Sequence, residues 1–300
     1  MTPTRSPIPA ASLKRRFSVL LATVGTAAFL LAPSCVSAQV NLGTASNFGV
    51  LGATPNVNNT GLSVVTGNVG VSPAASIIGF PPGIATGTFE SGTAAAGQAQ
   101  TDLGIALAAT LLPALCNDLT GQDLGGLVLA PGVYCFNTSA QLTGNLKLDF
   151  QGNPNSAFLI RTGSTLTTAS NSSVLAINTG PNPVCLPNIN FRVGSSATLG
   201  TGTNFAGNIL AQVTITLNTG ASLRGRALAR TGTVTLDANP NVGGCPIAAA
   251  FAGGPIPPGA GAGAGTLVGA PTLQEWALIF LGLMLAALGG WQVRRKSLGR

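Results

Sequence analysis

Histidine is absent from this 300-residue sequence, and charged residues make up only 7% of it. Without histidine, the nucleophile–base pairs of serine and cysteine hydrolases cannot form. Glycoside hydrolysis needs two carboxylates that flank one bond, and within residues 39–270 only Asp118 and Asp123 lie close in the sequence. A zinc site is not expected either, because the chain has no Cys-x-x-Cys motif. The sequence therefore predicts no enzyme, no bound metal and no other cofactor.

The net charge of +7 comes from the two ends of the chain. Residues 1–38 carry four basic groups and no acidic group, and residues 271–300 carry four basic groups and Glu275. Between them, residues 39–270 hold six basic and six acidic residues, so this part has no net charge. A nucleic-acid surface needs basic groups clustered on the folded body, and we therefore expect no nucleic-acid partner.

The first 38 residues have the three parts of a secretory signal peptide. A basic start precedes an apolar run at residues 17–31, and small residues follow at 36–38. We expect cleavage after Ala38. Two alternatives remain open, a retained membrane anchor and a lipoprotein attached through Cys35, although the residues before Cys35 match a lipoprotein signal poorly.

The C-terminal end contains a second targeting region. Residues 276–293 form an uncharged apolar run, and basic residues follow directly after it. A run of this length can just cross a bilayer, and the basic cluster is expected to stay on the cytoplasmic side. We therefore expect a membrane-spanning helix here. Residues 250–270 contain mainly Gly, Pro and Ala and are expected to form a flexible linker.

Four cysteines remain after removal of the signal peptide. An even number in an exported chain favours two disulfides, and four cysteines allow three pairings. We favour the pairs of sequence neighbours, Cys116–Cys135 and Cys185–Cys245.

One segment, residues 93–112, has the pattern of a helix. Leucines recur there at every fourth position, which places them on one apolar face. Ser91 or Thr93 can cap the start of this helix. The leucines are Leu103, Leu107 and Leu111.

Elsewhere the body consists of short alternating stretches separated by Gly, Asn and Asp, which is typical of strands and turns. An order of hydroxyl, aliphatic, hydroxyl, aliphatic occurs at residues 196–199, 214–217 and 233–236. Thr165-Leu166 is a degenerate earlier copy. A period near twenty residues built from strands and turns predicts a β-solenoid.

Strand geometry assigns directions to these repeats. Successive side chains point to opposite faces, so the hydroxyl residues point outward if the aliphatic residues fill the interior. Neighbouring strands lie about 4.8 Å apart and alternate residues about 6.6 Å apart, which gives a regular grid of hydroxyls and methyls. Such a grid can order water; the alternative is that stacked threonines only stabilise the solenoid. The outward set is Ser196, Thr198, Thr214, Thr216, Thr233 and Thr235.

Six segments between about residues 40 and 243 form a recognisable set. They are VNLGTASNF (40–48), GNVGVSP (67–73), LAPGVY (129–134), DFQGNPN (149–155), VGSSATLGT (193–201) and GNILA (207–211). Together they resemble the bacterial and fungal ice-binding protein family. The resemblance implies an all-β fold with one long helix, in which a discontinuous three-faced β-solenoid carries the helix along one face. It also implies adsorption to ice through one flat sheet. The family's Thr-Ala/Gly-x-Thr/Asn motif matches residues 201–204 and adds Thr201 and Thr203 to the candidates.

The C-terminal tail begins with Pro271, Thr272, Leu273, Glu275 and Trp276, and the apolar run and the basic cluster follow. This order resembles the IPTL type of exosortase sorting signal, although Ala270 stands where that name expects Ile. The resemblance implies an exosortase-type processing enzyme as a partner. A plain C-terminal membrane anchor is the alternative.

Four parts follow from these patterns: a signal peptide at 1–38, a solenoid domain at 39–249, a linker at 250–270 and a sorting tail at 271–300. We expect an ice-binding protein displayed on the surface of a Gram-negative-type envelope, with ice or ordered water as its partner. The second hypothesis is a structural or adhesive envelope protein that uses the same solenoid.

Overall fold

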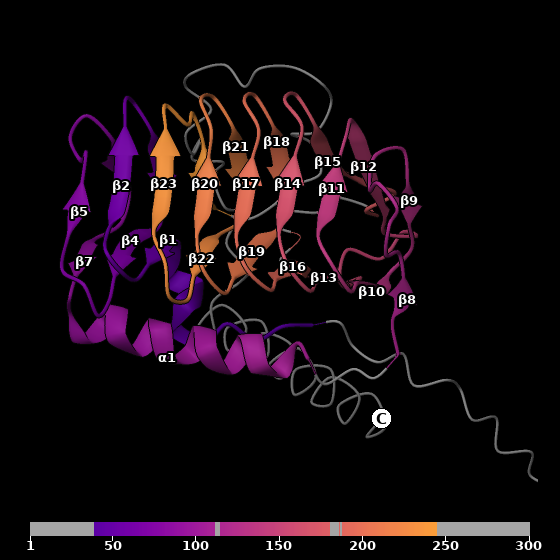
Figure 1. Cartoon of the computed structure of the whole chain (residues 1–300), viewed down its shortest axis with the longest axis horizontal. Helices are drawn as coiled ribbons and strands as arrows, with labels where there is room; N and C mark the ends of the chain where they lie inside the picture. Colours follow the sequence, from indigo (N-terminus) through magenta and orange to yellow (C-terminus); the bar gives the residue numbers. More distant parts are fainter. Residues whose placement is uncertain (1–38, 112–114, 181–185, 187, 245–300) are drawn as a thin grey trace, which may run out of the picture. The chain divides into compact units, whose positions relative to one another are not determined.

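The described part of the chain is a β-solenoid with three faces (Figure 1). The computed structural model describes residues 39–111, 115–180, 186 and 188–244. Within these residues the paired strands run parallel and form three sheets of nine, seven and eight strands. The three-faced solenoid and the single long helix found among the described residues confirm the fold implied by the resemblance.

Each sheet runs along the solenoid and forms one of its faces. Sheet A contains, in spatial order, β7 (Phe89–Ser91), β4 (Asn68–Val71), β1 (Phe48–Gly52), β22 (Ala227–Ala229), β19 (Asn208–Ala211), β16 (Ile189–Val193), β13 (Phe158–Thr162), β10 (Gly132–Phe136) and β8 (Asn117–Asp118). Sheet B contains β11 (Ala140–Leu142), β14 (Leu166–Thr168), β17 (Ala197–Leu199), β20 (Ile215–Leu217), β23 (Val234–Asp237), β2 (Val57–Thr60) and β5 (Ile77–Ile78). Sheet C contains β6 (Ile84–Ala85), β3 (Val64–Thr66), β24 (Val242–Gly243), β21 (Ser222–Arg224), β18 (Asn204–Ala206), β15 (Ser173–Ile177), β12 (Asn145–Asp149) and β9 (Val128–Leu129).

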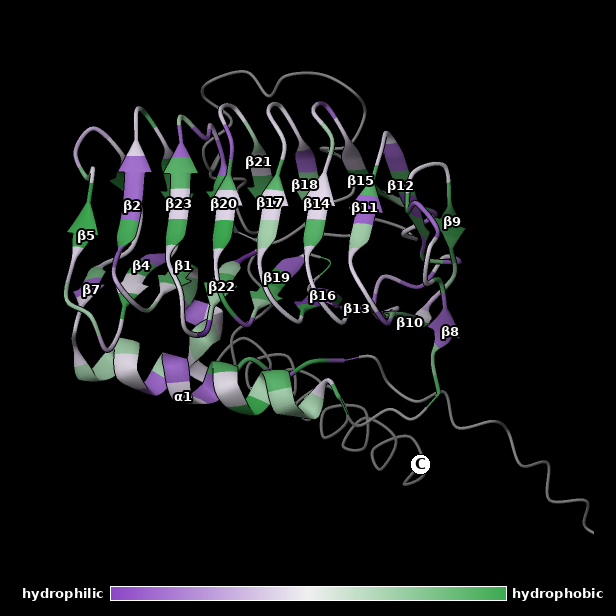
Figure 2. Cartoon of the chain, in the orientation of Figure 1, coloured by the Kyte–Doolittle hydropathy of each residue, from purple (hydrophilic) through white to green (hydrophobic). Residues whose placement is uncertain are grey.

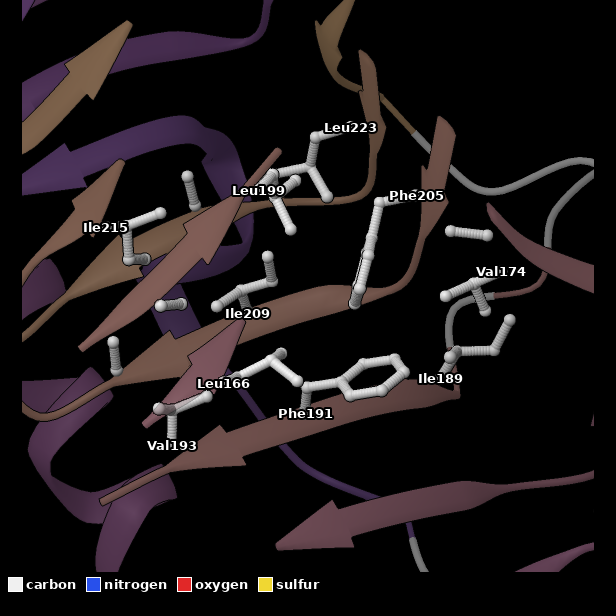
Figure 3. Close-up of a cluster of buried hydrophobic side chains, with 14 of the residues drawn as sticks. Leu166, Val174, Ile189, Phe191, Val193, Leu199, Phe205, Ile209, Ile215 and Leu223 are labelled. Carbon is white, nitrogen blue, oxygen red and sulfur yellow. The ribbon is translucent and has the colours of Figure 1, made fainter. Parts of the chain in front are cut away.

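Aliphatic and aromatic side chains from all three sheets fill the interior (Figure 3). Ile215 and Leu199 enter it from sheet B, and Phe191 and Phe205 meet between sheets A and C with ring centroids 4.6 Å apart. Burial of one such side chain stabilises the fold by roughly 1.5–3 kcal/mol. The core therefore runs continuously along the solenoid and holds the three sheets in a fixed register.

The order of strands in space differs from their order in the sequence. The last described coil, β22 to β24, pairs with the first coil, β1 to β3, at all three faces. Strands β4 to β7 extend the solenoid on the far side of that first coil. This is the discontinuity that the resemblance implies, and it places the pairing of the first and last coils inside each sheet rather than at its edge.

The helix α1 (Ala94–Ala109) lies along the outer face of sheet A, beside the short 3-10 helix η1 (Gly43–Asn47) (Figure 1). Thr93 caps its start by accepting a hydrogen bond from the amide of Ala96 at 3.3 Å. Leu103 and Leu107 pack on Leu51, Leu210 and Leu228 of the sheet.

The predicted helix was correct in position and wrong at its C-terminal end. Leu111 lies two residues after Ala109, the last residue of the helix, and is 55% exposed. It therefore does not continue the buried face that Leu103 begins. Gln100 is buried and donates hydrogen bonds to the carbonyls of Gly52 and Ala229 at 2.8 and 3.0 Å. This side chain ties the helix to β1 and β22, where the two ends of the described chain meet.

The disulfide Cys116–Cys135 is present, with its Cα atoms 5.8 Å apart, which confirms that pairing. The other expected pair, Cys185–Cys245, lies outside the described residues, as do the signal peptide, the linker, the sorting tail and the expected membrane-spanning helix. Among the described residues, no helix has the length and apolarity needed to cross a bilayer.

Candidate functional site

The outer face of sheet B carries two columns of small polar side chains. In β17, β20 and β23 the second residue of the strand points outward between two buried neighbours, as the alternation predicts. The register of the sheet aligns these outward residues in one line, which we call the central column. The central column consists of Gln141, Thr167, Thr198, Thr216, Thr235, Asn58 and Ile78.

A second line of polar residues lies two sequence positions before the residues of the central column, and we call it the flanking column. It includes Ser139, Thr165, Ser196, Thr214, Thr233 and Asn56. Its hydroxyls are joined in separate pairs across neighbouring strands. The hydroxyl of Thr165 donates to Ser139 at 2.8 Å, and that of Thr214 donates to Ser196 at 2.8 Å. Thr233 donates to the side-chain oxygen of Asn56 at 3.5 Å. These contacts hold the side chains of the flanking column in fixed positions.

The hydroxyls of the central column differ in their partners. Within the described residues, those of Thr167, Thr198, Thr216 and Thr235 make no hydrogen bond to a protein atom. All four side chains are half-buried, so their hydroxyls can bond to water while their methyl groups pack against neighbours. Figure 2 shows the result as a near-neutral band between hydrophobic bands on β17, β20 and β23.

The backbone beneath the columns is regularly hydrogen-bonded. The amides of Leu166, Ala197 and Ile215 donate to the carbonyls of Ser196, Thr214 and Thr233 at 3.1, 2.9 and 3.0 Å. Each bond joins neighbouring strands just beside an outward hydroxyl residue. The spacing of about 4.8 Å between strands is therefore repeated from β14 to β23 without interruption.

Neither column contains a charged side chain. The nearest carboxylate in the sequence is Asp237, at the end of β23, and it accepts a hydrogen bond from the hydroxyl of Thr219. The two columns themselves therefore offer water only uncharged donors, acceptors and methyl groups, and the carboxylates of Asp237 and Asp123 lie at their margins, beside Thr235 and Gln141.

Two of the eight predicted residues lie elsewhere. Thr201 is exposed in the turn between β17 and β18, and so lies beyond the end of the strand. Thr203 is 1% exposed and its hydroxyl pairs with that of Thr168 at 2.8 Å. The prediction of Thr203 as a surface residue was wrong, because the turn directs its side chain into the interior. The other six, Ser196, Thr198, Thr214, Thr216, Thr233 and Thr235, lie on the outer face of sheet B.

The face also contains residues that sequence reasoning missed. Thr167 follows the degenerate copy at Thr165-Leu166 and repeats its alternation, which is a signal that could have found it. Asn56 and Asn58 join the two columns through β2, because β2 pairs with β23. No local signal in the sequence marks these asparagines.

The acidic residues of the described body have structural partners. Asp118 accepts a hydrogen bond from the amide of Thr120, and the interactions of its carboxyl with the side chain and then the amide of Thr120 lower its pKa. Burial raises the pKa of Asp123, but the hydrogen bonds from Gly125 and Thr143 together lower it by more. The pKa of this carboxyl therefore lies below its ordinary value. A general acid at neutral pH needs a raised pKa. These two carboxylates therefore act as turn residues in this fold.

Comparison with known proteins gives the same picture. The model of a family described as Ice-binding-like matches residues 51–241, and the model of the IPTL-CTERM motif matches residues 271–295. An ice-binding protein of Nostoc sp. (strain HG1) is 50% identical over 230 residues, which are 76% of this chain and 82% of that protein.

Solved structures with the same fold are also ice-binding proteins. One from an Antarctic biological consortium has a TM-score of 0.65 and 39% identity, and the match covers 68% of this chain and 91% of that chain. One from the ascomycete Antarctomyces psychrotrophicus has a TM-score of 0.63 and 35% identity, and covers 68% of this chain and 98% of that chain.

Proposed function

Because the chain belongs to the ice-binding-like family, we propose that it adsorbs to ice through the outer face of sheet B. The observation that carries this proposal is the central column, whose threonine hydroxyls have no partner among the described protein atoms. An ice surface is itself a regular array of water, and hydroxyls repeated at the strand spacing can hold water in such an array. The methyl groups between them limit how many positions that water can take.

The absence of charge from the two columns supports the same proposal. A charged side chain orders water around itself and resists the loss of that water, whereas a hydroxyl exchanges one water partner for another at little cost. The interaction surface is a repeated array rather than a pocket, and we assign no catalytic activity to it.

Thermal hysteresis and inhibition of ice recrystallisation test this function. We expect both from the wild-type protein, and we expect Thr216→Tyr to abolish them because the ring projects from the middle of the central column. The matched control is Ser222→Tyr, on β21 of the same coil but in sheet C. The absence of both effects in the wild type would favour the adhesive envelope protein instead.

We further propose export and display at the surface of a Gram-negative-type envelope. The support is the match of the IPTL-CTERM motif to residues 271–295 and the signal-peptide pattern at 1–38. In this proposal an exosortase-type enzyme processes the tail, with Pro271, Thr272, Leu273, Glu275 and Trp276 as its recognition residues and the apolar run as a membrane-spanning helix. Removal of residues 271–300 should release the protein into the medium; continued attachment to the cell would contradict this role of the tail.

A further inference from the structure

A groove of about 560 Å³ lies between α1 and the outer face of sheet A. One wall is the exposed side of the helix, with Ile105 and Ala108, and Leu111 extends this wall just beyond the end of the helix. The opposite side contains Arg192, Gln212 and Arg230 from the sheet and the turns that follow its strands. The groove is on a different face from the central column, so its properties are independent of ice binding.

The arginines beside this groove lie close to one another. Arg161 and Arg192 are paired in register on β13 and β16, so their side chains leave the same face of the sheet on neighbouring strands. Arg161 donates to the carbonyls of Thr110 and Leu111 at 3.2 and 3.3 Å, at the C-terminal end of α1. The partial negative charge of that helix end therefore stabilises Arg161.

The other two arginines lack comparable partners. Arg192 donates to the carbonyl of Thr162 at 3.3 Å, but its Nε atom is buried without a hydrogen-bond partner in the described structure. The side chain of Arg230 makes no hydrogen bond to any described residue. Burial and the neighbouring charge of Arg161 both lower the pKa of Arg192. These positive charges are therefore only partly compensated.

No carboxylate of the described body compensates them, because each one is bonded elsewhere. The six are Glu90 (to Thr88 and Thr93), Asp102 (to Thr44 and Gln98), Asp118 (to Thr120), Asp123 (to Gly125 and Thr143), Asp149 (to Gln151 and Asn178) and Asp237 (to Thr219). The seventh acidic residue of the sequence, Glu275, belongs to the sorting tail. A half-buried guanidinium without an anion has lost part of its hydration, so an anion from outside the chain would be favoured here.

We propose that this groove binds a small organic monocarboxylate with an apolar group. The planar carboxylate matches the fork of a guanidinium, and Gln212 offers an amide donor beside it. The apolar group lies against Ile105 and Leu111, which are 64% and 55% exposed without a ligand. The groove has the size of a typical small-molecule site.

Benzoate, benzamide and phenyl phosphate are suitable probes, because they share an aromatic group and differ in the polar group. The full chain, labelled with ¹⁵N and held in an uncharged detergent, is titrated while the Nε–Hε signals of its arginines are followed by NMR. We expect benzoate to shift the signals of Arg192 and Arg230 saturably and benzamide to leave them unchanged. Equal shifts with benzamide, or at least tenfold tighter binding of phenyl phosphate, would overturn the assignment of a carboxylate.

Variants test the groove itself. Arg192→Gln and Arg230→Gln should each weaken benzoate binding at least tenfold, whereas Lys147→Gln removes an exposed charge on β12 of sheet C and should have no effect. Ile105 is exposed on the helix, so its replacement leaves the fold intact. Ile105→Glu places a carboxylate in the groove and should block benzoate, and Ile105→Gln should not. Wild-type affinity in both arginine variants and in Ile105→Glu would show that benzoate binds elsewhere.

Discussion

At the scale of residues, the two columns of sheet B contain the same side-chain types in different states. The hydroxyl of Thr214 is used within the protein, because it donates to Ser196. Thr216 lies two residues later and on the same outer face of sheet B. Its hydroxyl has no partner among the described protein atoms. The flanking column therefore stabilises the face, and the central column is available to ordered water.

Replacement of each threonine by valine separates these roles. Thr214→Val removes a hydrogen bond and should lower the free energy of unfolding by about 1 kcal/mol. Thr216→Val removes a hydroxyl without a protein partner and should change the free energy of unfolding by no more than about 0.5 kcal/mol. Urea unfolding measures both values. Equal losses in the two variants would mean that the hydroxyl of Thr216 also has a structural partner.

At the scale of elements, the helix α1 is fixed to the solenoid by polar contacts at its exposed side as well as by its leucines. Asp102 accepts hydrogen bonds from both the amide and the hydroxyl of Thr44 at 2.7 Å, and from Gln98 at 2.9 Å. Thr44 belongs to η1, so this carboxylate joins η1 to α1. The hydrogen bonds from Thr44 hold the pKa of Asp102 below its ordinary value of 3.8.

This contact predicts a dependence of stability on pH. A carboxyl whose pKa is lower in the folded state contributes stability above its unfolded pKa and loses that contribution as the pH falls through the folded pKa. The wild-type protein should therefore melt at a higher temperature than Asp102→Asn at pH 7, and the difference should shrink below about pH 3.8. The melting temperatures of both proteins, measured at several pH values, test this prediction. A difference that stays constant down to the acid limit would exclude a role for the ionised carboxylate.

At the scale of the whole molecule, the sequence predicts the repeated parts and not the junction between the ends. The repeats at 196–199, 214–217 and 233–236 are consecutive coils, so their spacing directly indicates stacked strands. The side chains of Asn56 and Thr233 are 177 residues apart in the sequence yet bonded, and no local pattern encodes that pairing. Thr203 was misplaced for a related reason, because the path of a turn depends on the coils on either side of it.

The groove at sheet A was also beyond sequence reasoning. It depends on where α1 ends relative to two neighbouring arginines, and the position of a helix end follows from tertiary packing rather than from periodicity. The disulfide Cys116–Cys135 was predictable, because its cysteines lie only 19 residues apart.

The disulfide Cys116–Cys135 should contribute to the stability of the whole domain. It closes a loop between the segment after α1 and strand β10, and the chain-entropy model gives about 3 kcal/mol for a loop of this length. Cys116→Ser combined with Cys135→Ser should therefore lower the melting temperature under oxidising conditions. A reducing agent should lower the melting temperature of the wild type by more than that of this variant, which keeps the expected Cys185–Cys245 pair. An unchanged melt in both experiments would contradict a stabilising disulfide.

The central claim is that the central column of sheet B is the surface that contacts ice, and a competition for growing ice tests it most directly. Ice is grown slowly from an equal mixture of wild-type protein and Thr216→Tyr, and mass spectrometry measures the ratio of the two in the melted ice. We predict strong enrichment of the wild type, and a ratio close to one when Ser222→Tyr replaces Thr216→Tyr in the mixture. Equal uptake of the wild type and Thr216→Tyr would contradict the claim.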